Sequence, residues 1–164
     1  VDTNNYTAFA EAIYKIFKGE IKNDSDLKKF VTFPFKLYKN SKYWIPPIIS
    51  EEMNNFKSDI NPSLKDSSIS LFIAIKDNEV VGRIAAIINW VEVKNYKVRK
   101  IRFGWFDVIN DINVTKLLIN RIKEISKSKG WNLIRWITRD DNTRAKSLYD
   151  RVAEKTNWDV YELK

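Results

Sequence analysis

The chemistry open to this chain is limited first by two residue types that it lacks. Its 164 residues include no histidine and no cysteine. This excludes Ser-His-Asp and Cys-His catalysis, disulfides, and metal sites built on cysteine or histidine. A general base must therefore be a carboxylate, an amine, a tyrosine or a positioned water. We expect no metal cofactor.

One charged residue stands inside an apolar run. Arg83 interrupts the stretch from Val80 to Ile88, which has the composition of a buried strand. A guanidinium in such a place must either face solvent or pair with a carboxylate. The sequence leaves both alternatives open.

The hydrophobic pattern predicts alternating helices and strands around these residues. Apolar residues at helical spacing predict an N-terminal extension (1–19) with a helix over 6–18, and a second helix that begins near Asp24 or Ser25. Pro34 should break or kink this second helix. Residues 43–47 are expected to be extended, and residues 51–70 to form a loop with at most one short helix.

The remaining elements follow from β-type and helical runs. Strands are expected at 20–22, 71–75, 80–88, 101–109, 131–138 and 158–163, with a turn at Asp77-Asn78, and helices at 117–130 and 142–155. A hairpin that leads into a β-α-β-α-β tail predicts an α/β (α+β) fold. Its central sheet is mixed and mostly antiparallel, with helices on both faces. We expect one domain over 1–164.

Two motifs give this order a family resemblance. The first is Asn142-x-x-Ala145-x-x-Leu148-Tyr149, placed directly after the strand that ends at Thr138. The second is spread over residues 26–90 and comprises Phe30-x-x-Phe33-Pro34-x-x-Leu37-Tyr38-Lys39, Trp44-Ile45-Pro46-Pro47, Asn61-Pro62, Phe72-x-Ala74 and Val81-Gly82-Arg83-Ile84-Ala85. Together they resemble the GNAT superfamily of acyl-CoA-dependent N-acyltransferases, in a bacterial branch without an assigned substrate.

The resemblance implies transfer of an acetyl group from acetyl-CoA to an amine acceptor, a small molecule or a peptide, in a ternary complex. It implies that Asn142 contacts the cofactor arm and that Tyr149 protonates the departing thiolate. From the residues alone, Asn142 could equally be a helix N-cap and Tyr149 a core tyrosine. The cofactor-binding residues are then expected to be Phe106, Val108, Asn110, Asn113, Val114, Thr115, Asn142, Ala145 and Lys146.

Asp107 is the candidate general base, directly or through a water. Phe106, Trp105 and Ile109 are expected to surround it with apolar groups that strengthen it as a base. A backbone N–H near Asp107 or Val108 would polarise the thioester carbonyl. An exposed carboxylate at the end of a strand is the alternative.

The loop before the helix at 117–130 departs from the family pattern. Where GNAT enzymes carry a basic residue and two glycines, this chain has Ile109, Ile112 and Val114, and Asp111 adds a negative charge. Either the loop follows another path, with Asn113 or Thr115 capping the helix, or the cofactor site has decayed. In the second case the domain would be a non-catalytic module that binds a partner protein or an acyl ligand.

Charge and composition bound the partners. The net charge is +8, from 21 Lys and 8 Arg against 21 acidic residues. These basic residues are scattered, which favours a solvated surface over a nucleic-acid footprint; a basic RNA-associated domain is the weaker alternative. No apolar run is long enough to span a membrane, and no secretory signal is recognisable. We therefore expect a cytoplasmic protein without a membrane partner, with a homodimer left open.

Overall fold

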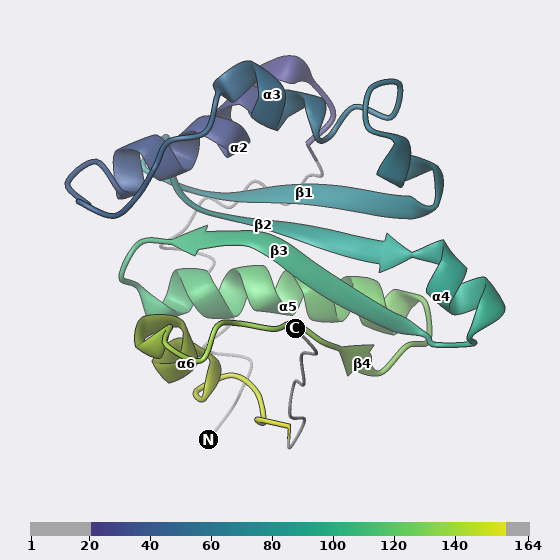
Figure 1. The fold of residues 1–164 in the computed structure, drawn as a ribbon. Helices are drawn as coiled ribbons and strands as arrows, with labels where there is room; N and C mark the ends of the chain where they lie inside the picture. The colour runs from purple at the N-terminus through teal and green to yellow at the C-terminus, as the bar shows by residue number, and fades with distance from the viewer. Residues whose placement is uncertain (1–20, 157–164) are drawn as a thin grey trace, which may run out of the picture.

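The computed structural model describes residues 21–156, which form one four-stranded sheet with helices on both faces (Figure 1). The strands are β1 (Ser67–Lys76), β2 (Glu79–Asn89), β3 (Lys100–Val108) and β4 (Leu133–Ile134), in the spatial order β1-β2-β3-β4. The first three are antiparallel, and β4 runs parallel to β3. The predicted mixed, mostly antiparallel sheet is confirmed.

The β1–β2 hairpin forms where the sequence predicts it. Asp77 and Asn78 connect the strands with φ values of 50° and 64°. Two consecutive residues with positive φ match the right-handed twist of paired strands, and Asp and Asn tolerate this conformation best after Gly. The strand β1 begins at Ser67, four residues earlier than the apolar run suggests.

Each face of the sheet carries helices (Figure 1) and its own cluster of buried apolar side chains. Helices α2 (Asp24–Leu37) and α3 (Ile49–Asn54) cover one face, where Phe30, Val31 and Ile73 are almost fully buried. Helix α5 (Ile112–Ser128) covers the other face with Val114, Leu118 and Ile122. None of the described helices is long and apolar enough to cross a bilayer.

Helix α2 continues through Pro34, so the expected break at this residue is wrong. Proline has no N–H, so it cannot donate to the carbonyl of Phe30 one turn earlier. Arg83, from β2, supplies the missing donor: its Nη1 lies 3.0 Å from the Phe30 oxygen, and its guanidinium lies over the Phe30 ring. The proline is buried and its lost hydrogen bond is replaced from the sheet.

Several elements are shorter than expected, or were missed. The strand expected over 131–138 pairs only at Leu133–Ile134, and α6 (Thr143–Tyr149) ends six residues before Lys155. Helix α4 (Trp90–Asn95) was not predicted. Most of α3 and the whole 3-10 turn η1 (Pro62–Lys65) lie in the stretch where a loop with at most one short helix was expected. Ile21 donates to Leu71 O without forming a strand. The expected helix at 6–18 and strand at 158–163 lie outside the described residues.

Gly82 allows α5 to pack closely on the sheet. A Cβ added there would lie 2.9 Å from side-chain atoms of Leu118 and Val114 and 3.0 Å from one of Val108. Gly104, on β3, has more space: an added Cβ would meet only Ile87, at 3.5 Å. The glycine on β2 is therefore a packing requirement, and the glycine on β3 is not.

We predict that Gly82→Ala lowers the free energy of unfolding by about 1–3 kcal/mol, because overpacking displaces α5. Gly104→Ala, the matched control, should change it by less than about 0.5 kcal/mol. Urea unfolding of both variants measures the difference. If both variants lost the same free energy of unfolding, the packing of α5 would not depend on a glycine at position 82.

Candidate active site

The candidate site lies where β3 and β4 separate. The two strands pair only at Lys100–Leu133 and Ile101–Ile134, after which β4 ends while β3 continues to Val108. Arg135 donates one more hydrogen bond to Ile101 O. Beyond that point the edge of β3 has no β4 partner, so its backbone groups are not paired within the sheet on that side. Asp107 and Val108, near which the sequence analysis expects the thioester carbonyl to be polarised, stand at the end of β3 beside this splay.

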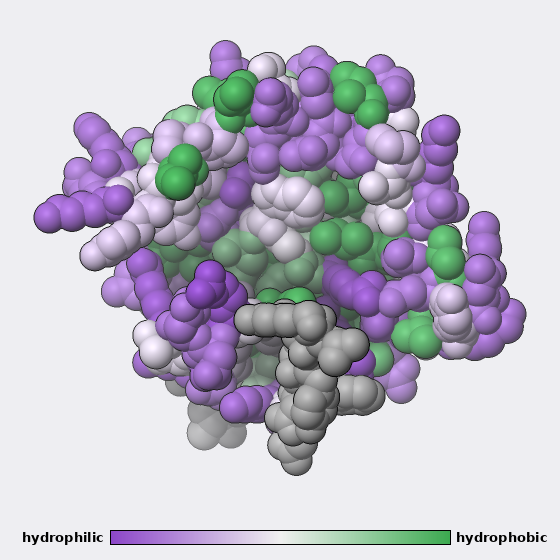
Figure 2. Space-filling model, in the orientation of Figure 1, coloured by the Kyte–Doolittle hydropathy of each residue, from purple (hydrophilic) through white to green (hydrophobic). Residues whose placement is uncertain are grey.

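Four aromatic rings line this splay. Phe103 and Phe106 come from β3, Trp136 from the segment after β4, and Tyr149 from α6. The Trp136 and Tyr149 ring centroids lie 5.3 Å apart, and Phe106 stacks on Tyr149 at 6.4 Å. Figure 2 shows apolar groups at the centre of this face, over β3, between hydrophilic rims. Apolar side chains around a single phenol are suited to a neutral acyl group and to one proton transfer.

A β-bulge in β3 sets which side chains face the splay. Arg83 pairs with Asp107 and Ala85 with Gly104, so Trp105 and Phe106 together oppose the single residue Ile84. Trp105 has φ of 47°, a conformation that strains a residue with a side chain. Its indole N–H donates to Glu52 at 2.6 Å, which holds it against α3. The bulge directs Phe106 to the α5 face and Asp107 to the α2 face.

Asp107 is the centre of a hydrogen-bonded network. Arg83 Nε donates to its Oδ2 at 2.7 Å, and the Tyr38 hydroxyl donates to its Oδ1 at 2.7 Å. Arg83 is buried, so of the two alternatives left open by the sequence, pairing with a carboxylate is confirmed. The expected apolar surroundings of Asp107 are wrong, because its partners are polar. Each carboxylate oxygen retains lone pairs for a further donor.

Tyr149 and Tyr38 both keep their protons more strongly than free tyrosine. Burial raises the pKa of the Tyr149 phenol, and the negative charge of Asp107 raises it further. Burial also raises the pKa of Tyr38, as do its hydrogen bond to Asp107 and the charge of that carboxylate. A phenol that is protonated at neutral pH can serve as a general acid. The carboxylate and the two phenols are therefore coupled across β3.

The first turn of α5 differs from expectation. Asp111 is its N-cap and accepts from Asn113 N at 2.8 Å, whereas Asn113 or Thr115 was expected to cap. The acid therefore occupies a backbone N–H that could otherwise bind a phosphate. The Val114 and Thr115 side chains are buried in the core, so only their backbones could contact a ligand. Asn110 and Asn113 are exposed beside them.

Helix α6 brings its predicted residues to the other side of the splay. Asn142 is the N-cap, accepting from Ala145 N at 3.1 Å, so the capping alternative is confirmed. Lys146 donates to Asp140 through a salt bridge of 2.7 Å. Both contacts are made within the segment from Asp140 to Lys146. Phe106 and Tyr149 lie together, while Val108 faces Gly82 and α5.

Sequence reasoning missed Tyr38 as a site residue. Tyr38 is the C-cap of α2, and its ring packs against Trp44 with centroids 5.7 Å apart. The available signal was the Leu37-Tyr38-Lys39 end of an apolar helical run, which indicates a helix end and no particular partner. Only the tertiary packing of α2 on β3 brings this hydroxyl to Asp107.

No family model matches the chain. Two curated relatives align with part of it. Protein YghO of Escherichia coli K12 is 34% identical over 108 residues, or 66% of this chain and 27% of that protein. The bacterial ceramide synthase of Caulobacter vibrioides is 25% identical over 111 residues, or 67% of this chain and 29% of that protein. The chain thus spans about a quarter of the length of these relatives.

Solved structures define the class of fold. A possible acetyltransferase from Clostridium difficile 630 superposes with a TM-score of 0.63 at 17% identity, over 89% of this chain and 95% of that one. The aminoglycoside N-acetyltransferase AAC(6')-Iy, solved with CoA, gives a TM-score of 0.59 at 16% identity, over 87% and 95%. The chain has the fold of the GNAT acetyltransferases, as the sequence resemblance predicts.

We predict that Asp107→Asn lowers the free energy of unfolding by about 3 kcal/mol, because it leaves the buried Arg83 charge unpaired. The double variant Arg83→Met/Asp107→Asn should lose clearly less than the sum of the two single losses. Urea denaturation of the four proteins gives the coupling.

The exposed Lys36–Glu79 pair is the matched control for this cycle. Glu79→Gln should change stability by less than about 0.5 kcal/mol. Additive effects of the Arg83 and Asp107 substitutions would show that the buried pair is not coupled.

Alkaline pH should destabilise the fold through Tyr38 and Tyr149. Their pKa values are raised in the folded state, so above about pH 10 the unfolded chain releases protons that the folded chain retains. The contribution of these two tyrosines to the free energy of unfolding is therefore complete below the pKa of tyrosine in the unfolded chain, and it is lost as the pH rises above that value. In urea unfolding between about pH 9 and 11, Tyr38→Phe/Tyr149→Phe should show a smaller loss than wild type. Substituting the exposed Tyr43 by Phe should leave the loss unchanged.

Proposed function

We propose that this chain is an N-acyltransferase domain that transfers an acyl group, with acetyl as the simplest case, from an acyl-CoA to an amine. The observation that carries the proposal is the β3–β4 splay, with a protonated phenol, Tyr149, near a carboxylate, Asp107. A thioester and an amine react directly when held together, and they need one proton acceptor and one proton donor. The GNAT fold of the chain also supports an acyltransferase function.

Asp107 and Tyr149 would divide the proton transfers of the reaction. The amine nitrogen forms a bond to the thioester carbonyl carbon, and the carbon–sulfur bond breaks. Asp107, directly or through a water, takes a proton from the amine, and Tyr149 gives its proton to the thiolate. Solvent exchange then returns Tyr149 to the phenol and Asp107 to the carboxylate, so that amide and thiol are the only products. Arg83 and Tyr38 would orient the carboxylate.

The residues fit an acyl-CoA at the thioester end better than at the pyrophosphate end. The aromatic rings and the unpaired β3 edge suit an acyl group and an amide-containing arm. At the N-terminus of α5, Asp111 already holds the Asn113 amide, so a phosphate would depend on the other first-turn amides, which have no carbonyl one turn earlier. Asn110, Asn113 and Asn142 are exposed donors around the splay. We expect weaker cofactor affinity than a glycine-rich loop provides.

Two kinds of amine are suggested by the similar proteins. The aminoglycoside acetyltransferase structures suggest a polar small molecule. The curated relative named bacterial ceramide synthase suggests a long-chain amino alcohol, since a ceramide is the amide of such an amine. The apolar lining by Phe103, Phe106 and Trp136 favours the second.

Release of free thiol is the experiment that tests this function. The chain has no cysteine, so every thiol detected must come from CoA. We predict thiol release from acyl-CoAs of short and long chain length in the presence of a suitable amine, among aminoglycosides, polyamines and long-chain amino alcohols. Tyr149→Phe should lower this rate about tenfold or more. Tyr43→Phe is the control.

Thermal unfolding separates a lost proton donor from a lost binding site. At about 100 times its dissociation constant, an acyl-CoA should stabilise the chain by roughly 2.7 kcal/mol, and equally in Tyr149→Phe. No thiol release with any pair, together with no thermal shift, would refute the proposed function. An unchanged rate in Tyr149→Phe would remove that residue from the chemistry.

A further inference from the structure

The segment between α2 and α3 exposes large apolar side chains. Tyr43 is 94% exposed, Ile45 87% and Ile48 61%, all within six residues. Single exposed apolar residues are ordinary on a protein surface, but a group of them marks an interaction surface. We call residues 43–48 the apolar loop.

The apolar loop is held in place and does not fold back onto the core. Trp44 packs inward against Phe35 and Tyr38, with ring centroids 5.1 Å and 5.7 Å apart. Pro46 and Pro47 restrict the backbone to extended conformations. Ile48 is the N-cap of α3 and makes no side-chain cap hydrogen bond, although a polar residue there would stabilise the helix by about 1 kcal/mol. An apolar side chain is thus kept outward at a position that favours a polar one.

The charge on the apolar loop and on the residues before it is positive, whereas Glu51 and Glu52 follow in the first turn of α3. Residues 36–50 contain Lys36, Lys39 and Lys42 and no acidic residue. Lys36 pairs with Glu79, whereas Lys39 and Lys42 are exposed and have no ion pair among the described residues. Lysines that flank exposed Tyr and Ile side chains are typical of segments that bind an anionic lipid surface, where each lysine and each buried methylene adds affinity.

We propose that the apolar loop docks the domain on an anionic lipid bilayer. Tyr43, Ile45 and Ile48 would enter the interface between headgroups and acyl chains, with Lys39 and Lys42 against the lipid phosphates. This is peripheral binding, which needs no membrane-spanning helix, and it revises the expectation of a chain without a membrane partner.

The position of the apolar loop connects this surface to the active site. The loop follows α2, and it lies across the end of β3 from α6 (Figure 1). Trp44 contacts Tyr38, whose hydroxyl donates to Asp107. An amphipathic amine drawn from a bilayer would therefore reach the carboxylate past Trp44. This consequence rests on the proposed function, whereas bilayer binding itself does not.

Vesicle co-sedimentation without acyl-CoA tests the docking separately from catalysis. The 164-residue chain is mixed with phosphatidylcholine vesicles that either contain or lack phosphatidylglycerol. We expect binding to the anionic vesicles and at least about tenfold weaker partitioning of Tyr43→Ser/Ile45→Ser, which removes most of the apolar contact. Lys39→Gln/Lys42→Gln should weaken binding at low salt more than at high salt.

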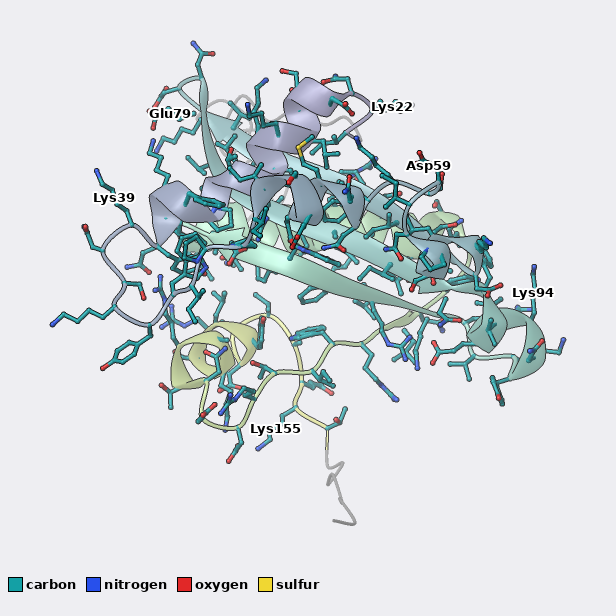
Figure 3. All side chains as sticks on the ribbon, turned by 45° about the horizontal axis from the view of Figure 1, so that its top comes forward. Lys22, Lys39, Asp59, Glu79, Lys94 and Lys155 are labelled. Carbon is teal, nitrogen blue, oxygen red and sulfur yellow. The ribbon has the colours of Figure 1, made fainter. Side chains whose placement is uncertain are left out.

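Tyr96→Ser is the matched control. Tyr96 is 71% exposed and follows α4, and Figure 3 shows Lys39 and Lys94 at opposite ends of the molecule. Its substitution should leave binding unchanged, and circular dichroism checks that each variant is folded. No binding of the wild-type chain, or equal loss in Tyr96→Ser and the loop variants, would overturn the proposal. So would a loop variant that keeps vesicle binding but dissociates a dimer.

Discussion

The buried guanidinium of Arg83 is the interaction on which the arrangement of this domain depends. It joins three elements: its own strand β2, the carboxylate of Asp107 on β3, and the carbonyl of Phe30 on α2. A charge at 7% exposure must have its donors satisfied, or the fold would lose several kcal/mol. Pro34 leaves that carbonyl without a helical donor. Arg83 therefore supplies the donor that the Phe30 carbonyl lacks because of Pro34, and this carbonyl in turn satisfies a donor of the buried guanidinium. This interaction fixes α2 on the sheet.

That fixed helix is what makes a site at the end of β3. Tyr38 follows the last residue of α2, so its hydroxyl reaches Asp107 only if α2 keeps its register on the sheet. The bulge at Trp105 fixes in turn which face of the sheet each side chain at the end of β3 occupies. Without the extra residue, Phe106 and Asp107 would exchange faces, because side chains alternate along a strand. One bulge thus separates the apolar lining from the charged network and keeps both next to Tyr149.

The elements of this fold that the sequence predicted correctly are those with a local signal in their own residues. The Asp77-Asn78 turn, the long apolar strands and the amphipathic helix ending before Gly130 each carry their own signal. The prediction at Pro34 was wrong because a local rule predicts a break, while the compensating donor to the Phe30 carbonyl, Arg83, lies 53 residues from Phe30 in sequence. The strand expected over 131–138 has the right composition. It pairs with β3 only at Leu133–Ile134, and beyond that point Trp136 packs its ring against Phe103 of β3.

The candidate site also has features that the sequence indicates locally and features that depend on tertiary contacts. For Arg83 the sequence left solvent and a carboxylate partner both open, and it named Asp107 as a candidate base without connecting the two residues. Only the tertiary structure pairs them and adds Tyr38. At α5 the sequence indicated that Asp111 stands near the expected phosphate position, and the structure shows what Asp111 does there. Asp111 places its charge at the positive end of the helix dipole and bonds to Asn113 N, which stabilises the first turn. A glycine-rich loop leaves these amides free for phosphate and lacks that cap. This chain has the cap, so under the proposed function more of the binding energy for an acyl donor would come from the splay, through the acyl group and the arm that follows it.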